Sequence, residues 1–373
     1  MTRTGRENVV NRIEDKQLAE SLKGINRRHL MKAAVTGASV FAVAGLPEPA
    51  RAQRAQFRFR MQSFLGPGNF EWEDLVPRFV RRVREMSGGR IEIQAFPPGA
   101  LIPTFEMLDG VINRVVDIGY GAQVYWRGRF PMCLFTWGIP FAFNTIDQYD
   151  YLWHEAGLNK LVDDAFQTVG VKFLGPLYSD EWGSTQSRVE IKRLTDFRGL
   201  KVRSFGIAAE IWKHFGASIV TVPGEEIYTA LATGVADAAN WGSPYGFAQL
   251  KLEEVAKFYL GPPLIMSDAE DAFMNKAAWD SLPGELQQVI LTAQRVWALE
   301  RYTRASFESA RVVGRMKQAG VTFNTMVPED LETMKRLTVE FTDKLAGNDA
   351  GARAALKIIR DTQAVFGLRP PGI

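Results

Sequence analysis

Apolar and polar residues repeat with two alternating periods along the chain from Phe57 onward. Residues 57–64 and 91–96 alternate apolar and polar side chains, which is typical of half-buried β-strands. Residues 71–86 place apolar or aromatic residues three and four positions apart, the spacing of one buried helix face. A further helix is predicted at about 104–114, leading into a short buried strand at 115–120.

A second series with the same rhythm begins near Val171. It predicts helices at 207–215 and 225–232, and strands at 171–174, 200–204, 218–222 and 236–241. Repeated strand–helix–strand units are typical of mainly parallel sheets with right-handed crossovers. The pattern therefore predicts an α/β protein with two similar halves.

Long helical patterns fill the last quarter of the chain. Ser281 is predicted to cap a helix with Pro283 in its first turn, and the pattern then runs unbroken over residues 285–319. Such a helix is roughly three times the mean length in globular proteins. Further helices are predicted at 328–345 and 351–366. Helices this long indicate a scaffold across both halves or a dimer contact.

The first 52 residues have the pattern of an export signal. Arg27 and Arg28 precede a modestly apolar run at 33–46, and Ala50-Arg51-Ala52 matches an Ala-x-Ala cleavage site. A membrane anchor would need about 20 apolar residues, which is more than this run provides. The pattern predicts a twin-arginine signal peptide over residues 1–52, cleavage before Gln53 and a periplasmic protein.

Charge and composition exclude several classes of function. Residues 53–373 carry 36 basic and 37 acidic side chains, so they offer no electrostatic footprint for nucleic acid. They contain no stretch of 18 uninterrupted apolar residues, which predicts no membrane insertion of the exported chain. Cys133 is the one cysteine and is predicted to be a small buried residue. Cys133 and the two histidines of this range, His154 and His214, are too few to build a zinc or haem site.

Familiar catalytic motifs are missing from the sequence. Residues 242–246 lack the spacing of a Gly-x-Ser-x-Gly elbow, and residues 66–68 lack the third glycine of a dinucleotide loop. No Walker loop or His-Glu-x-x-His motif occurs.

Candidate binding residues stand instead at predicted strand ends. Arg203 ends a strand immediately before a helix, and Trp241 and the segment 120–126 follow other strands. Ligands of open α/β sheets bind just beyond such ends, where a guanidinium can hold both oxygens of a carboxylate. The alternative is that the aromatic residues belong to the core and that Arg203 forms a surface salt bridge.

Four stretches of the chain resemble the DctP-type solute-binding subunits of TRAP transporters, the tripartite ATP-independent periplasmic transporters. They are residues 99–117, 197–203 (Phe-Arg-Gly-Leu-Lys-Val-Arg), 228–239 and 275–283 (Asn-Lys-Ala-Ala-Trp-Asp-Ser-Leu-Pro). The similarity runs from about Phe57 to the C-terminal helices. Residues 240–242, Asn-Trp-Gly, are most similar to the branch that binds 2-oxo acids and related monocarboxylates.

The resemblance implies a two-lobed periplasmic-binding-protein fold with parallel or mixed sheets and a long helix spanning both lobes. Lobe I is expected at 53–176 with part of 263–300, and lobe II at 177–262 with part of 300–373. The lobes would close over a small organic carboxylate and deliver it to the membrane components of a TRAP transporter. A homodimer through the C-terminal helices is a further expectation.

The resemblance also assigns roles to residues, with Arg203 as the carboxylate-binding arginine. The predicted substrate-binding residues are Arg203, Trp241, Asn240, Trp182, Gln186, Tyr125, Gln123 and Phe64. A sodium or calcium ion bridging the substrate carboxylate would be held by Gln186, Asn240 and Trp241. The 2-oxo-acid branch has an acidic residue where this chain has Asn240, which weakens the expectation of both the cation and a 2-oxo acid. Arg188 is either a second positive contact or a surface residue.

Two other functions stay open on sequence alone. The twin-arginine route, often used by proteins that fold around a cofactor, favours a secreted enzyme acting on a small carboxylate. A ligand-sensing subunit docked on a membrane receptor would share the same sequence features. Because no cofactor or catalytic motif occurs, the prediction is a binding protein rather than an enzyme.

Overall fold

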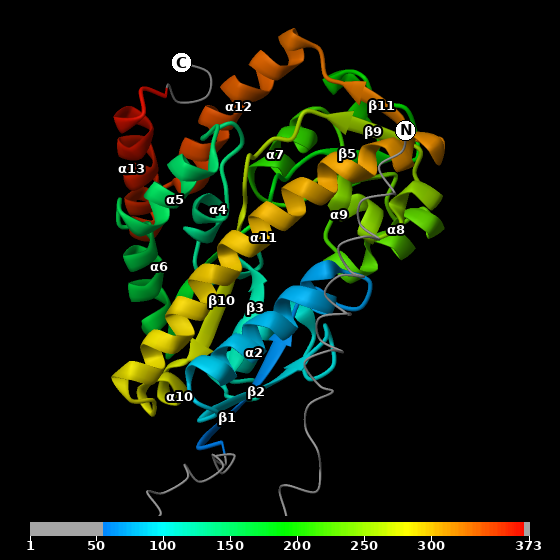
Figure 1. Ribbon diagram of the computed structural model, residues 1–373. Helices are drawn as coiled ribbons and strands as arrows, with labels where there is room; N and C mark the ends of the chain where they lie inside the picture. Colours follow the sequence, from blue (N-terminus) through cyan, green and yellow to red (C-terminus); the bar gives the residue numbers. More distant parts are fainter. Residues whose placement is uncertain (1–54, 369–373) are drawn as a thin grey trace, which may run out of the picture. The chain divides into compact units, whose positions relative to one another are not determined.

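The computed structural model describes residues 55–368, so the predicted signal peptide and its cleavage site lie outside the described range. The described residues belong to one compact unit, which two β-sheets organise (Figure 1). None of the helices within residues 55–368 combines the length and apolar character of a membrane-crossing helix.

The first sheet has five strands in the order β2-β1-β3-β10-β4. Ile91 and Ile93 of β2 are buried while the residues between and after them are exposed, so the alternation in the sequence matches the faces of the sheet. β1 runs parallel to β2 and β3, whereas β10 is antiparallel to β3 and β4. The strands are β1 (Phe57–Ser63), β2 (Ile91–Phe96), β3 (Ile118–Ala122), β4 (Val171–Tyr178) and β10 (Ala269–Asn275).

The second sheet has six short strands in the order β11-β9-β5-β8-β6-β7. They are β5 (Thr185–Ser187), β6 (Lys201–Arg203), β7 (Ser218–Val220), β8 (Ala238–Asn240), β9 (Phe258–Gly261) and β11 (Thr322–Thr325). β6 is parallel to β7 and β8, while β5 is antiparallel to β8 and β9. Both sheets are mixed, and the expectation of mainly parallel sheets is too simple. β10 joins the first sheet and β5 joins the second as antiparallel strands, and neither is connected to its neighbours in the sheet by a strand–helix–strand crossover.

Helices cover both sheets, and those that the sequence pattern predicted lie close to their predicted ranges. The first half contains η2 (Glu71–Leu75), α2 (Val76–Met86), η3 (Thr104–Glu106), α3 (Met107–Ile112), η4 (Gln123–Trp126), α4 (Cys133–Thr136), α5 (Ile146–His154) and α6 (Leu158–Gln167). The second half contains η5 (Leu194–Phe197), α7 (Gly206–His214), η6 (Gly224–Glu226), α8 (Ile227–Thr233), α9 (Pro244–Gln249) and η7 (Leu252–Glu254). The chain ends with α10 (Lys276–Asp280), α11 (Gly284–Gln318), α12 (Pro328–Ala346) and α13 (Ala350–Val365). Of these helices, α4, α5, α6, α9 and α10 were not predicted. Cys133 is fully buried, as predicted.

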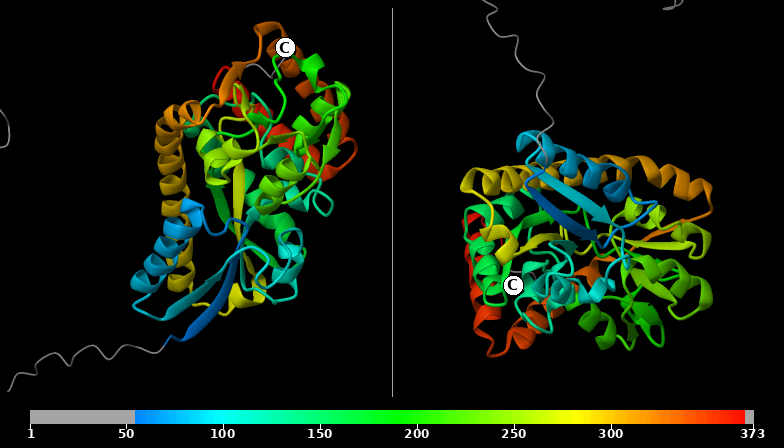
Figure 2. Two further views of the ribbon diagram at one scale, coloured as in Figure 1. Left: turned by 90° about the vertical axis from the view of Figure 1, so that its right-hand side faces the viewer. Right: turned by 90° about the horizontal axis from the view of Figure 1, so that it is seen from below.

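The long helix α11 connects the two sheets and runs along one side of the molecule (Figure 2). It packs against α2 and β4 of the first half and against α9 of the second. Trp297 belongs to the large core around the first sheet, while Val312 and Met316 belong to a smaller core under the second. One helix therefore contributes to both hydrophobic cores.

The start of α11 differs from the prediction. Ser281 does not cap it, because the Ser281 hydroxyl donates to the carbonyl of Ala278 and closes α10. α11 begins at Gly284, with Pro283 as its flanking residue.

Candidate functional site

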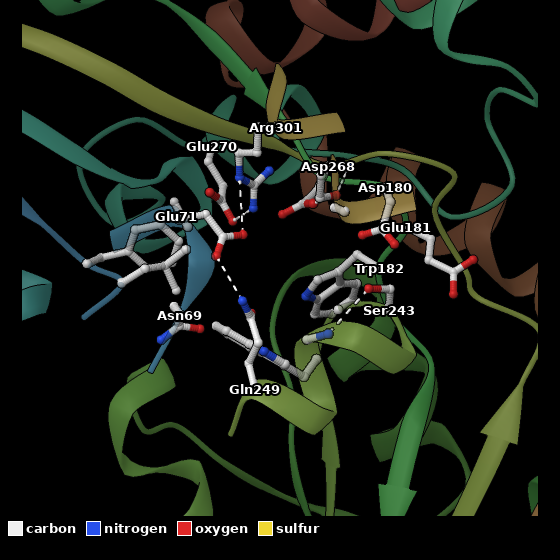
Figure 3. A pocket seen from close by; sticks show the side chains of 18 of the residues that line it. Asn69, Glu71, Asp180, Glu181, Trp182, Ser243, Gln249, Asp268, Glu270 and Arg301 are labelled. Atoms are coloured by element: carbon white, nitrogen blue, oxygen red, sulfur yellow. Dashed lines mark hydrogen bonds and ion pairs between the residues drawn. The ribbon is translucent and has the colours of Figure 1, made fainter. Parts of the chain in front are cut away.

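A cavity of about 630 Å³ lies where strand ends of the two sheets meet (Figure 3). Phe64 follows β1, Asp180 follows β4, Arg203 ends β6 and Trp241 follows β8. Glu270 stands near the beginning of β10, which is antiparallel to its neighbours and so starts at the same edge. Ligands of open α/β sheets bind at these edges. The cavity is the candidate binding site.

Arg203 presents an unpaired donor to this cavity. Its side chain is 1 % exposed, its Nε donates to the carbonyl of Val222 at 3.2 Å, and its Nη1 donates to the carbonyl of Asn240 at 2.8 Å. Nη2 has no hydrogen-bond partner within residues 55–368. Burial lowers the pKa of Arg203 to about 10, and Tyr125 opposes that shift, so the guanidinium remains charged at neutral pH. A buried charge with a free N–H group is suited to an anionic ligand.

Aromatic rings surround the guanidinium. Its central carbon lies 4.5 Å from the ring centroid of Phe205 and 4.9 Å from that of Trp241. Tyr125 packs on Phe205 with ring centroids 5.4 Å apart and edge-on to Phe64 at 6.3 Å. Burial raises the pKa of Tyr125 to about 12, against the effect of nearby Arg203, so its hydroxyl keeps its proton. These rings hold the guanidinium in place and exclude water around it.

A second charged group in the lining centres on Arg301 of α11. Its Nη2 lies 2.7 Å from a carboxylate oxygen of Glu270, and its Nε lies 3.7 Å from one of Glu71. The second carboxylate oxygen of Glu270 accepts a hydrogen bond from the hydroxyl of Tyr120 at 2.6 Å. The second carboxylate oxygen of Glu71 accepts one from the amide Nε2 of Gln249 at 3.3 Å. Burial raises the pKa of both carboxyl groups, and Arg301 opposes the shift. Figure 3 shows the two carboxylates converging on the guanidinium.

Three further carboxylates line the cavity without a cationic partner. Asp180 accepts from the hydroxyl of Ser309 at 2.6 Å. Asp268 accepts from the Ser179 hydroxyl and, at 3.0 Å, from the indole of Trp137. Burial raises the pKa of Asp180 and Asp268 and brings that of Glu181 to about 7.

The structure brings five of the eight predicted substrate-binding residues together. The five that line the cavity are Phe64, Tyr125, Trp182, Arg203 and Trp241.

The remaining three predicted residues, Asn240, Gln186 and Gln123, are fully buried but do not line the cavity. Each amide group makes at least one hydrogen bond inside the fold, although Nε2 of Gln123 and Oε1 of Gln186 have no partner within residues 55–368. Gln186 donates to the carbonyl of Ala256 at 2.7 Å, and Gln123 accepts from the hydroxyl of Thr136. Asn240 is the last residue of β8, and it is the next residue, Trp241, whose side chain lines the cavity.

Two of the three predicted cation ligands, Asn240 and Trp241, use their oxygen atoms in hydrogen bonds within the fold. The side-chain oxygen of Asn240 accepts from the indole of Trp212, and its amide nitrogen donates to Thr185 at 2.6 Å. The carbonyl of Trp241 accepts from the backbone N–H of Gly183 at 2.8 Å. Residues 55–368 contain no group of three or more His, Cys, Asp or Glu side chains arranged to hold a metal ion. Two of the three predicted ligand oxygens, those of Asn240 and Trp241, thus already accept hydrogen bonds, whereas Oε1 of Gln186 has no hydrogen-bond partner within residues 55–368.

Arg188 lies outside the cavity and is exposed. Of the two alternatives for this residue, the structure supports the surface role.

The acidic residues and Arg301 were missed by the sequence reasoning. One signal was present: Asp268, Glu270 and Asp271 interrupt the apolar run that forms β10, and acids in a buried strand require a special environment. Arg301 carried a similar signal. It falls four positions after buried Trp297 and four before buried Ala305, on the inward face of α11.

Comparison with known proteins gives one matching family and many similar folds. The family model of the bacterial extracellular solute-binding proteins, family 7 (DctP), matches residues 63–348. A monocarboxylate 2-oxoacid-binding periplasmic protein of Nostoc sp. PCC 7120 is 29% identical over 284 residues, covering 73% of this chain and 74% of the relative. A 2,3-diketo-L-gulonate-binding periplasmic protein of Escherichia coli is 27% identical over 259 residues, covering 65% of this chain and 74% of the relative.

Solved structures share the fold. A TRAP periplasmic solute-binding protein of Pseudoalteromonas atlantica, with bound sodium and pyruvate, has a TM-score of 0.78 at 23% identity, covering 84% of this chain and 95% of the other. One from Bordetella bronchiseptica, with copurified calcium and picolinate, has a TM-score of 0.77 at 22% identity, covering 84% and 94%. At these identities the likeness establishes the two-sheet fold.

Proposed function

The chain belongs to the DctP family, the bacterial extracellular solute-binding proteins of family 7, and from this premise we propose that it captures a small organic carboxylate for a TRAP transporter. The family consists of binding proteins rather than enzymes. The curated relative from Nostoc is described as binding monocarboxylate 2-oxo acids, and the solved relatives contain pyruvate or picolinate. These relatives support the ligand class.

The observation that carries the proposal is the free Nη2 of Arg203, a buried guanidinium flanked by the rings of Phe205 and Trp241. Within residues 55–368, no carboxylate lies within ion-pair distance of Arg203, and Glu225 acts on it only at longer range. Removing a charge from water is costly unless an opposite charge is supplied. A ligand carboxylate supplies the opposite negative charge and accepts hydrogen bonds from the unused N–H groups of Nη2.

The second step is closure of two lobes around the ligand. Arg203 and Trp241 come from the second sheet, while Phe64 and Tyr125 come from the first. A ligand held among them touches both halves and is enclosed when they approach. We place the lobes at 53–176 with part of 263–300 and at 177–262 with part of 300–373, joined along α11. Release to the membrane components requires the lobes to separate again.

The site is also expected to work without a bridging cation. Asn240 contributes no charge, and its oxygen already accepts from Trp212. The relatives that contain sodium or calcium support a cation site in the family. In this chain we propose that Arg203 provides the positive charge that binds the carboxylate.

The proposal is tested by screening the purified protein against small organic acids by thermal shift, together with native mass spectrometry of any ligand retained through purification. The expected result is a raised melting temperature with one or more carboxylates, since binding to the folded state stabilises it. Neutral amides of the same acids are the matched controls and should produce no shift. A panel in which acids and amides behave alike would overturn the proposal, and turnover of an acid would favour the enzyme alternative.

A further inference from the structure

The charges that line the cavity place a second requirement on the ligand. Arg203 and Arg301 are the only two guanidinium groups in the lining, and they face five carboxylates: Glu71, Asp180, Glu181, Asp268 and Glu270. A ligand with one carboxylate and no other charged group would bring a sixth acidic group into this space.

Arg301 does not offset the excess of acids. Its guanidinium already has Glu270 at 2.7 Å and Glu71 at 3.7 Å, so the protein compensates its charge. Its Nε and Nη1 lack hydrogen-bond partners within residues 55–368. A second ligand carboxylate at these donors would nevertheless lie against Glu71 and Glu270. Arg203 differs because its contacts within the same residues are carbonyl oxygens and aromatic rings.

The other three carboxylates have no cation of their own. The carboxylate of Asp180 accepts from the Ser309 hydroxyl, and that of Asp268 accepts from the Ser179 hydroxyl and the Trp137 indole, all of which are neutral donors. Glu181 accepts none from the described part of the chain, and only burial and nearby Asp180 perturb it. When ionised, these carboxylates offer only acceptors and negative charge. Burial raises the pKa of each of them, and a cationic nitrogen beside them would favour the ionised form.

We propose that the ligand is zwitterionic, with its carboxylate on the free Nη2 of Arg203 and a cationic nitrogen on the acidic part of the lining, against Asp180 and Asp268. This inference rests on the proposed function and narrows its ligand class to amino or other cationic-nitrogen carboxylic acids. An ammonium group has three donors and no acceptor, which matches a surface of carboxylate oxygens. An ammonium group also supplies positive charge beside the acidic side chains. A hydroxyl group would form hydrogen bonds without that charge, and a second ligand carboxylate would be repelled by the acidic side chains.

Matched ligands separate these cases by calorimetric titration. The first set is butanoate, 4-hydroxybutanoate, 4-aminobutanoate and succinate. The second set compares 2-aminobutanoate with 2-hydroxybutanoate, in which the amino or hydroxyl group lies closer to the carboxylate. The amino member of at least one set should bind at least tenfold tighter than its hydroxyl and unsubstituted analogues. Succinate should be the weakest member of its set.

Variants of the acids test the location of the nitrogen. Asp180→Asn and Asp268→Asn should each lower the ratio of amino-ligand to hydroxy-ligand affinity by about fivefold or more. Exposed Glu190→Gln is the control and should leave that ratio unchanged. If burying an altered side chain prevents folding, the half-buried Glu181→Gln provides the same readout.

The outcomes distinguish this inference from the proposed function. If no carboxylate in either set or in the wider acid screen binds, the proposed function fails. If carboxylates bind but amino analogues gain nothing, or succinate binds tightest, the zwitterion inference is overturned and carboxylate capture stands. An unchanged affinity ratio in all three acid variants would also overturn it.

Discussion

Glu181 and Arg203 show how burial determines charge at the scale of single residues. Burial brings the pKa of Glu181 up to about 7 and that of Arg203 down to about 10. Arg203 therefore stays cationic throughout the physiological range, while Glu181 titrates within it. The cost of this carboxyl group to folding therefore grows as the pH rises from its ordinary pKa of 4.5 to about 7, and is complete above that pH.

The consequence is a pH-dependent effect of Glu181→Gln on stability. A carboxyl group with a raised pKa in the folded state stabilises folding at low pH, and that contribution is lost as the pH rises through about 7. The substitution should change the free energy of unfolding little at pH 5 and should stabilise the protein at pH 8. Urea unfolding at both pH values measures this, with exposed Glu155→Gln as the control. Equal effects at the two pH values would contradict the raised pKa.

Asn240 leads to a second prediction at this scale. Its amide is held by Trp212 and Thr185, and it contributes no charge to a cation. Exhaustive chelation and replacement of sodium by choline should change ligand affinity by less than about threefold. A large loss of affinity on cation removal would show that other oxygen atoms bind a metal ion with the ligand.

At the scale of an element, α11 carries a buried charge into the cavity at Arg301. This side chain is 4 % exposed and pairs with two equally buried carboxylates. Buried ion pairs are often close to neutral as a whole, but deleting one partner leaves an uncompensated buried charge.

Arg301→Ala should therefore lower the free energy of unfolding by about 3–5 kcal/mol. Arg315→Ala, on the exposed face of the same helix, should change it by less than about 0.5 kcal/mol. Chemical denaturation of both variants measures the difference. Similar stability for the two variants would show that Glu71 and Glu270 bind protons in the folded protein and need no guanidinium.

At the scale of the whole molecule, the two-sheet arrangement with a site between strand ends predicts closure on binding. Small-angle scattering should give a smaller radius of gyration with saturating ligand than without it. The matched neutral amide should leave the curve unchanged. An identical radius with and without the ligand would contradict the closure of the lobes. The homodimer through the C-terminal helices remains a separate prediction, and light scattering of the purified protein tests it.

Strong periodicity made much of the fold predictable from the sequence. β2 has the predicted bounds, and α11 differs from its prediction by one residue at each end. β5 and β10 were not predicted. β5 consists of three polar residues, and buried Glu270 and Asp271 break the apolar pattern of β10.

The candidate site was predictable only where local sequence places a side chain at a strand end. Arg203 and Trp241 could be found in this way, because β6 and β8 are parallel neighbours. Glu71 and Arg301 reach the same cavity from helices, so their convergence depends on the packing of distant elements. The hydrogen bond from Trp212 that engages Asn240 likewise depends on the packing of α7 against β8.

Calorimetric titration of the best-binding organic acid against Arg203→Ala, Arg203→Lys and Arg188→Ala tests carboxylate capture most directly. Because Arg203 is buried and has no ion-pair partner within residues 55–368, its removal should cost about 3–5 kcal/mol, or two to three and a half powers of ten in affinity. Lysine should recover only part of the loss, since an ammonium cannot form two parallel hydrogen bonds. Exposed Arg188→Ala should bind like the parent. A folded Arg203→Ala protein that binds the acid within threefold of the parent would contradict the account.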